Sequence, residues 1–132
     1  MHKGVSVKLY FWIACAMSIF ILGNSFGLFL LVSAIFIIPL IIIHFLAGIK
    51  SKNTVNKLLV LSATNLLLFS LVRCDGVHNT SDSGLSALLD IVNINFGFSS
   101  EYEKIHHFLS FVFFIFQAIL DVSILQKSIY RD

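Results

Sequence analysis

Charged residues are scarce in this sequence, in which Asp, Glu, Lys and Arg together make up 12% of 132 residues. With a mean hydropathy of +0.94, the chain has too much apolar surface to hide from water in a soluble domain of this length. Its two cysteines have neither the number nor the spacing of a disulfide framework or a zinc site. A net charge of +2 gives no clustered basic face for nucleic acid.

The sequence also lacks the local signatures of enzymes. It contains no nucleophile elbow, no glycine-rich phosphate loop and no pair of histidines at metal-ligand spacing on a helix. We therefore expect a non-enzymatic protein with no cofactor and no metal, whose main partner is the lipid bilayer.

Long apolar runs dominate what is present, and each is long enough for a membrane helix of about 20 residues. The run from Leu9 to Ile49 would form one helix of about 60 Å, twice the hydrocarbon thickness, if nothing interrupted it. The turn-forming segment Gly23 to Gly27 divides it into a hairpin. The sequence predicts an all-α, integral membrane four-helix bundle in one domain, residues 1–132, with spans at about 5–22, 28–49, 55–72 and 104–126.

An outer segment, residues 73–103, separates spans three and four. Within it Leu85, Leu88, Leu89, Val92 and Phe96 recur at helical spacing with polar residues opposite, which predicts an amphipathic helix. Ser100 and Glu103 form a capping box, which predicts where the last helix begins.

The positions of the basic residues orient the chain, because Lys and Arg near membrane spans are retained on the cytoplasmic side. With four spans, the N-terminus, the second turn and the C-terminus share a side. That side holds seven of the nine basic residues, and only Arg73 and Lys104 lie on the other. We expect a multi-pass protein of the bacterial inner membrane with both ends in the cytoplasm and an acidic, extracytoplasmic outer segment.

The last span carries the most informative pattern, a row of polar residues on one helical face. We call this row the polar seam: Glu103, His107, Ser110, Gln117, Asp121 and Ser128. Polar groups in hydrocarbon are costly unless they face protein or water, so the seam should point into the bundle or into an oligomer interface. Hydrogen bonding between helices is favoured over an ion or proton pathway.

Asp121 has two interpretations, because an ionisable residue within a span is a functional candidate by default. Its place near the predicted cytoplasmic end slightly favours a purely structural role, in which it reaches headgroup water or pairs with Lys127 or Lys57. His44 and Asn65 are single polar residues of spans two and three, and we expect each to be a satisfied packing group.

The hairpin at Gly23 to Gly27, the lysine turn from Lys50 to Lys57 and the segment from Arg73 to Lys104 together give a layout that resembles the membrane subunit of Kiwa-type anti-phage defence systems. The resemblance covers the whole chain but transfers no functional residue. It implies a subunit that senses membrane perturbation and recruits a cytoplasmic effector.

The seam is expected to favour a homo-oligomer, and the exposed lysines Lys50, Lys52 and Lys57 are expected to dock the effector. Two alternatives remain open. The layout is also similar to immunity proteins of pore-forming bacteriocins, and an oligomeric channel or holin-like pore would need the seam to line water.

Overall fold

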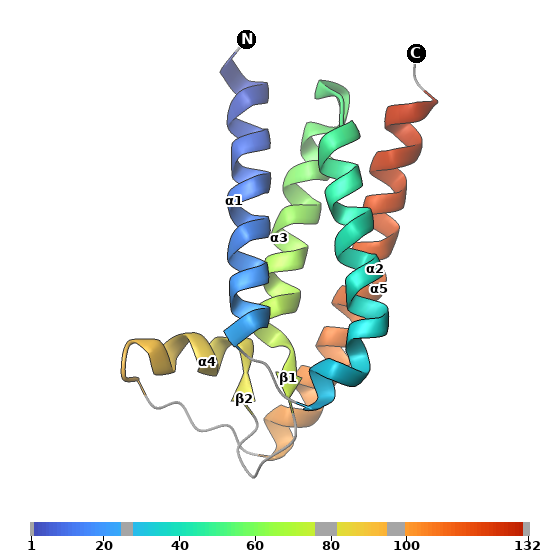
Figure 1. Cartoon of the computed structure of the whole chain (residues 1–132). Helices are drawn as coiled ribbons and strands as arrows, with labels where there is room; N and C mark the ends of the chain where they lie inside the picture. The colour runs from blue at the N-terminus through green and yellow to red at the C-terminus, as the bar shows by residue number, and fades with distance from the viewer. Residues whose placement is uncertain (1, 25–27, 76–81, 95–99, 131–132) are drawn as a thin grey trace.

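The computed structural model describes residues 2–24, 28–75, 82–94 and 100–130, and four of its helices are long and apolar enough to cross a membrane. These are α1 (His2–Asn24), α2 (Leu28–Lys50), α3 (Asn56–Val72) and α5 (Ser100–Ile129). They run side by side as one bundle (Figure 1). The predicted all-α class with four apolar helices of membrane-spanning length is therefore confirmed, and the helix bounds lie within a few residues of the predicted ones.

The third span reaches full length through a short 3-10 helix, η1 (Asn53–Val55), which leads directly into α3. Together they form a 20-residue apolar segment, Asn53–Val72. This length matches the hydrocarbon core of a bilayer. α2 also runs without interruption through Pro39, whose missing N–H is tolerated in membrane helices.

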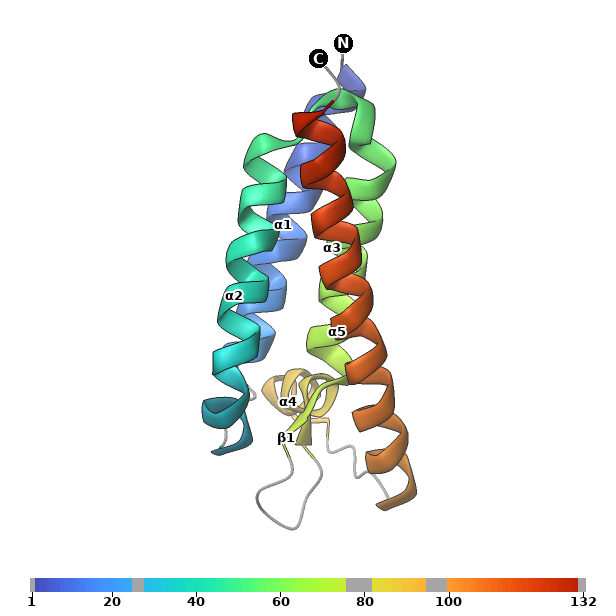
Figure 2. The ribbon, with the colours of Figure 1, turned by 90° about the vertical axis from the view of Figure 1, so that its right-hand side faces the viewer.

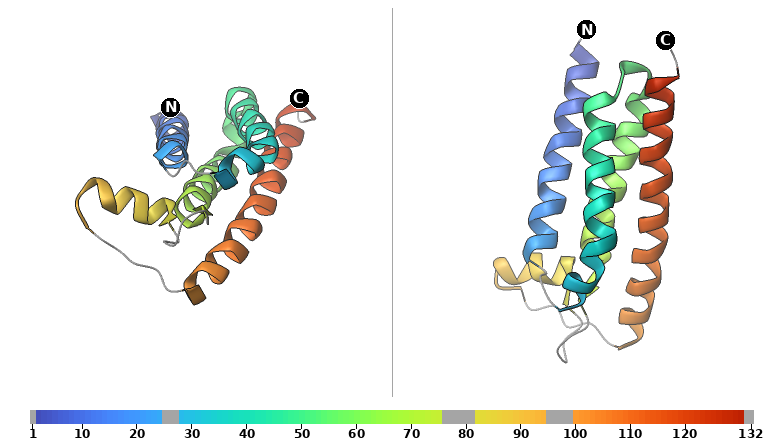
Figure 3. Two further views of the ribbon diagram at one scale, coloured as in Figure 1. Left: turned by 60° about the horizontal axis from the view of Figure 1, so that its bottom comes forward. Right: turned by 45° about the vertical axis from the view of Figure 1, so that its right-hand side comes forward.

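The two ends of the bundle differ. The two termini and the connection between α2 and α3 lie at one end (Figures 1 and 2). At the other end a two-residue antiparallel pair, β1 (Cys74–Asp75) and β2 (Asp82–Ser83), leads into the short helix α4 (Gly84–Ile91). α4 lies across the bundle rather than along it (Figure 3).

The predicted amphipathic helix is present as α4, but it is shorter than its apolar pattern suggested. Ser83 accepts a hydrogen bond from the Ser86 backbone N–H and so caps its start. The helix stops at Ile91, and Asn93 follows with a φ of 60°, a left-handed conformation that ends helices. Phe96, predicted to continue the apolar face, and the Ser100–Glu103 capping side chains lie outside the described residues.

α3 is the central helix, with α1 and α5 packed against it, while α2 packs mainly against α5. Gly48 lets α2 approach α1, since a Cβ there would lie 2.2 Å from Cε1 of Phe11. Two apolar clusters fill the interior, one around Phe11 and Leu59 and one around Leu66 and Phe69. Much of the outer surface is apolar, as a lipid-facing surface must be.

Candidate functional site: a buried polar network

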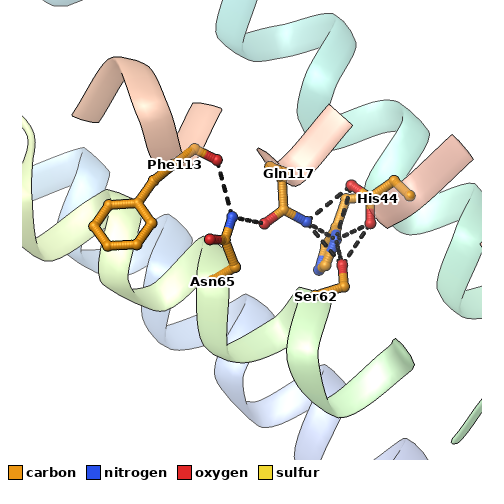
Figure 4. A network of polar contacts seen from close by, with 6 residues as sticks. His44, Ser62, Asn65, Phe113 and Gln117 are labelled. Carbon is orange, nitrogen blue, oxygen red and sulfur yellow. Dashed lines mark hydrogen bonds and ion pairs between the residues drawn. The ribbon is translucent and has the colours of Figure 1, made fainter. Parts of the chain in front are cut away.

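Three of the four spans contribute polar side chains to one cluster in the interior of the bundle (Figure 4). This polar network consists of His44 from α2, Ser62 and Asn65 from α3, and Gln117 and Asp121 from α5. All five side chains are buried. The two residues of α3 are three positions apart and those of α5 are four apart, so each helix presents its pair on one face.

The network lies well inside the membrane-spanning region. His44 is six residues from the end of α2 at Lys50, and Asp121 is eight from the end of α5 at Ile129. At 1.5 Å per residue these separations correspond to about 9 and 12 Å of helix, a substantial part of the roughly 30 Å hydrocarbon core. Neither side chain is therefore at a helix end in contact with headgroup water.

The Asp121 carboxylate is the centre on which donors converge. Ser62 Oγ donates to Asp121 Oδ1, and Gln117 Nε2 donates to Oδ2 at 2.9 Å. His44 Nδ1 lies 3.0 Å from Oδ1, at ion-pair distance. One carboxylate thus joins side chains of α2, α3 and α5.

A chain of amides extends the network along the bundle axis. Asn65 Nδ2 donates to Gln117 Oε1 at 2.8 Å and to the backbone oxygen of Phe113 at 2.9 Å. Gln117 Nε2 in turn donates to Ser62 Oγ at 2.8 Å. Along the path from Asn65 through Gln117 to Asp121 each amide donates toward the carboxylate, and hydrogen bonds arranged in this way polarise and strengthen one another.

The His44 ring is held from the side by an aromatic neighbour. Phe11 of α1 stacks on it, with ring centroids 4.4 Å apart and planes 25° from parallel. Nδ1 faces both Asp121 Oδ1 and Gln117 Nε2, each at 3.0 Å, so the tautomer of the ring decides which of the two contacts is a hydrogen bond. Nε2 has no hydrogen-bond partner among the described residues.

In hydrocarbon these contacts hold the spans together. A hydrogen bond between membrane helices contributes on average about 0.6 kcal/mol and up to about 2 kcal/mol. Removing one side chain of the network costs more free energy than its own hydrogen bonds contribute. Its partners stay buried, where water cannot replace the hydrogen bonds they have lost. The network thus fixes how α2, α3 and α5 face each other, and the Phe11 stack ties α1 to the same point.

The structure separates the members of the predicted polar seam. Gln117, Asp121 and Ser128 are buried and face the bundle. Ser110 donates to the backbone oxygen of His107 in its own helix, and both of these residues line a groove described below. The seam is therefore divided between the bundle interior and this groove, and the side chain of Glu103 lies outside the described residues.

The prediction that Asp121 reaches headgroup water or pairs with Lys127 or Lys57 is wrong. The carboxylate is fully buried, and its partners are His44, Ser62 and Gln117. Sequence reasoning placed it near a helix end but did not recognise that His44 of α2 comes to the same depth. The signal was present, since His44 and Asn65 are isolated polar residues in apolar runs, and such residues need partners in other helices.

The lysine cluster, Lys50, Lys52 and Lys57, is exposed at the end of the bundle that also holds the two termini. It is about 10 Å of helix away from the network, so the two features are separate. Within the described part of the chain, no group of three or more His, Cys, Asp or Glu residues is placed to hold a metal ion.

No protein-family model, curated protein or solved structure matches this chain.

Proposed function

We propose that the chain is a non-enzymatic, multi-pass subunit of a bacterial inner membrane that recruits an acidic cytoplasmic effector at the lysine cluster, as part of an anti-phage defence system. The observation that carries the proposal is where the polar and charged side chains lie in the bundle. The five side chains of the polar network are buried inside the bundle, whereas the side chains of the lysine cluster are exposed at one end.

The charge distribution supports a cytoplasmic partner. The N-terminus, the lysine cluster and the C-terminus lie at one end of the bundle and hold seven of the nine basic residues. Basic residues near spans favour the cytoplasmic side, so this end would face the cytoplasm. An exposed basic patch steers an acidic protein surface toward it and aligns the two during encounter.

The polar network argues against a pore between copies of the chain. Gln117 and Asp121, the polar residues deepest in the last span, are buried and hydrogen-bonded within one copy. They are therefore not free to line water between copies. Because these two side chains are buried within one copy, they also cannot contact a second copy, and they give no reason to expect self-association.

Affinity capture from membranes of the native host tests the proposal. The tagged chain should retain a soluble protein with an acidic surface in stoichiometric amount. The triple variant Lys50→Gln, Lys52→Gln and Lys57→Gln should lose it, whereas Lys104→Gln at the other end should not. Because the three substitutions remove basic residues that help to orient the chain, the topology of each variant has to be measured as well.

A cysteine-accessibility assay on each variant confirms that its orientation is unchanged. Retention of the soluble protein by the triple variant would contradict docking at the lysine cluster. A chain that is monomeric by native mass and brings down no soluble protein would favour the immunity-protein alternative, which protection against a pore-forming toxin then tests.

A further inference from the structure

A groove opens between α2 and α5 toward the end where α4 lies. The two helices move apart in this direction (Figure 2), and the groove between them has a volume of about 540 Å³. Ile37 and Phe69, with exposed fractions of 6% and 4%, form buried parts of its wall. Phe36 and Phe111 are 65% and 63% exposed, so the groove is open sideways to the lipid.

The two ends of the groove have opposite character. Arg73, which caps the C-terminus of α3, is 3% exposed and lines the end nearest the membrane surface. His107, three residues into the last span, lines the same end. Both also make contacts within the protein. The deeper part is lined by aromatic and aliphatic side chains, so the groove is basic at the interface and apolar in the hydrocarbon region.

We propose that this groove binds an anionic phospholipid, with the phosphate at Arg73 and His107 and an acyl chain along the apolar part. The groove and a phospholipid change polarity in the same order along the membrane normal. A phospholipid in the bilayer places its phosphate at the interface and its acyl chains beneath it. Arginine binds phosphate through charge-assisted hydrogen bonds, which strengthen when the guanidinium is shielded from water.

The dimensions of the groove favour a lipid over a protein helix. Its lining residues run from Ser33 to Ile37 on α2 and from His107 to Phe114 on α5. At 1.5 Å per residue these stretches are about 6 and 10 Å long. A partner helix or a second copy crossing the bilayer would need a complementary face along about 30 Å. The volume is also within the range of about 300 to 1,000 Å³ usual for small-molecule sites.

Native mass spectrometry of the full chain released from nanodiscs tests this site. The nanodiscs contain equal amounts of phosphatidylcholine and phosphatidylglycerol. We expect one phosphatidylglycerol to remain bound preferentially. Arg73→Gln should reduce its retention about tenfold or more, the loss expected for one charge-assisted hydrogen bond, and Arg73→Lys should keep part of it.

A second pair of variants tests the groove without touching the buried arginine. Ser110→Leu places a larger side chain in the groove and should displace the lipid. Ser123→Leu is its matched control, because Ser123 lies on the same helix, also donates to its own backbone, and is not part of the groove. A correctly folded Ser110→Leu protein that retains as much phosphatidylglycerol as wild type would overturn the proposal.

Two other outcomes would also overturn it. Equal retention of both lipids would show that the basic end does not select an anionic headgroup. A dimer free of bound lipid that dissociates in Ser110→Leu but not in Ser123→Leu would show that the groove is an interface between copies. None of these results depends on recruitment at the lysine cluster, so the site and the proposed function can fail independently.

Discussion

Replacing Asp121 by leucine should destabilise the bundle by about 3–5 kcal/mol, because it leaves the buried groups that converge on the carboxylate without their acceptor. The carboxylate is fully buried and receives contacts from His44, Ser62 and Gln117. Leucine removes the acceptor and leaves these polar groups in a water-free interior. A hydrogen bond to a charged group contributes about 1.5–3 kcal/mol. The expected loss is set below three times this value, because the remaining side chains can partly rearrange around the leucine.

The double variant His44→Phe and Asp121→Leu separates a network from a set of independent contacts. Phenylalanine keeps the stacking surface for Phe11, and with both partners replaced neither polar side chain is left buried without the other. We expect the double variant to be more stable than the sum of the single effects by at least about 1 kcal/mol, a coupling typical of residues in contact. Ser123→Ala is the control, since Ser123 bonds only its own helix in the contacts described, and it should change stability by less than about 0.5 kcal/mol.

Reversible unfolding in bicelles, monitored by steric trapping, measures these differences in the free energy of unfolding. Additive effects of the two substitutions would refute the interpretation of the cluster as one coupled network. A single Asp121→Leu effect below about 1 kcal/mol would refute the claim that the carboxylate holds three helices together.

Three further predictions concern packing and topology. Gly48→Ala should destabilise the bundle by about 1–3 kcal/mol in the same unfolding assay because its Cβ would overlap the Phe11 ring, whereas Gly23→Ala, with nothing within 4 Å, should not destabilise it. Gly84→Ala should detach the start of α4, since its Cβ would lie 1.9 Å from the backbone oxygen of Ser70. Hydrogen exchange of the α4 amides should then become faster, and unchanged protection of these amides would contradict this packing. Cysteines placed in the lysine cluster should react with a membrane-impermeant maleimide only after the cytoplasmic face is exposed, and labelling of intact cells would reverse the proposed orientation.

The sequence was sufficient to predict the four spans because their signals are local. Apolar length, the glycine-rich turn after Leu22 and the polar turn after Ile49 each act within a few residues, and the helices begin and end close to where these signals predict. The length of α4 was harder to predict. Its apolar pattern continues past Ile91, but the left-handed conformation of Asn93 ends the helix, and asparagine permits that conformation without requiring it.

The site was only half predictable for a different physical reason. The seam on α5 correctly identified a face with Gln117 and Asp121, because residues four apart share a face whatever surrounds them. Which residues complete that face depends on the relative depth and rotation of α2 and α3. A single histidine in an apolar run does not specify its partner, so the His44–Asp121 contact emerged only from the packed bundle.

Phage challenge of the native host tests the proposed function most directly. A deletion strain should lose protection against phage, and the wild-type chain should restore it. The triple lysine-to-glutamine variant, inserted in the same orientation and amount, should not. Phage sensitivity that is unaffected by deletion, or fully restored by the triple variant, would contradict recruitment at the lysine cluster as the function of this protein.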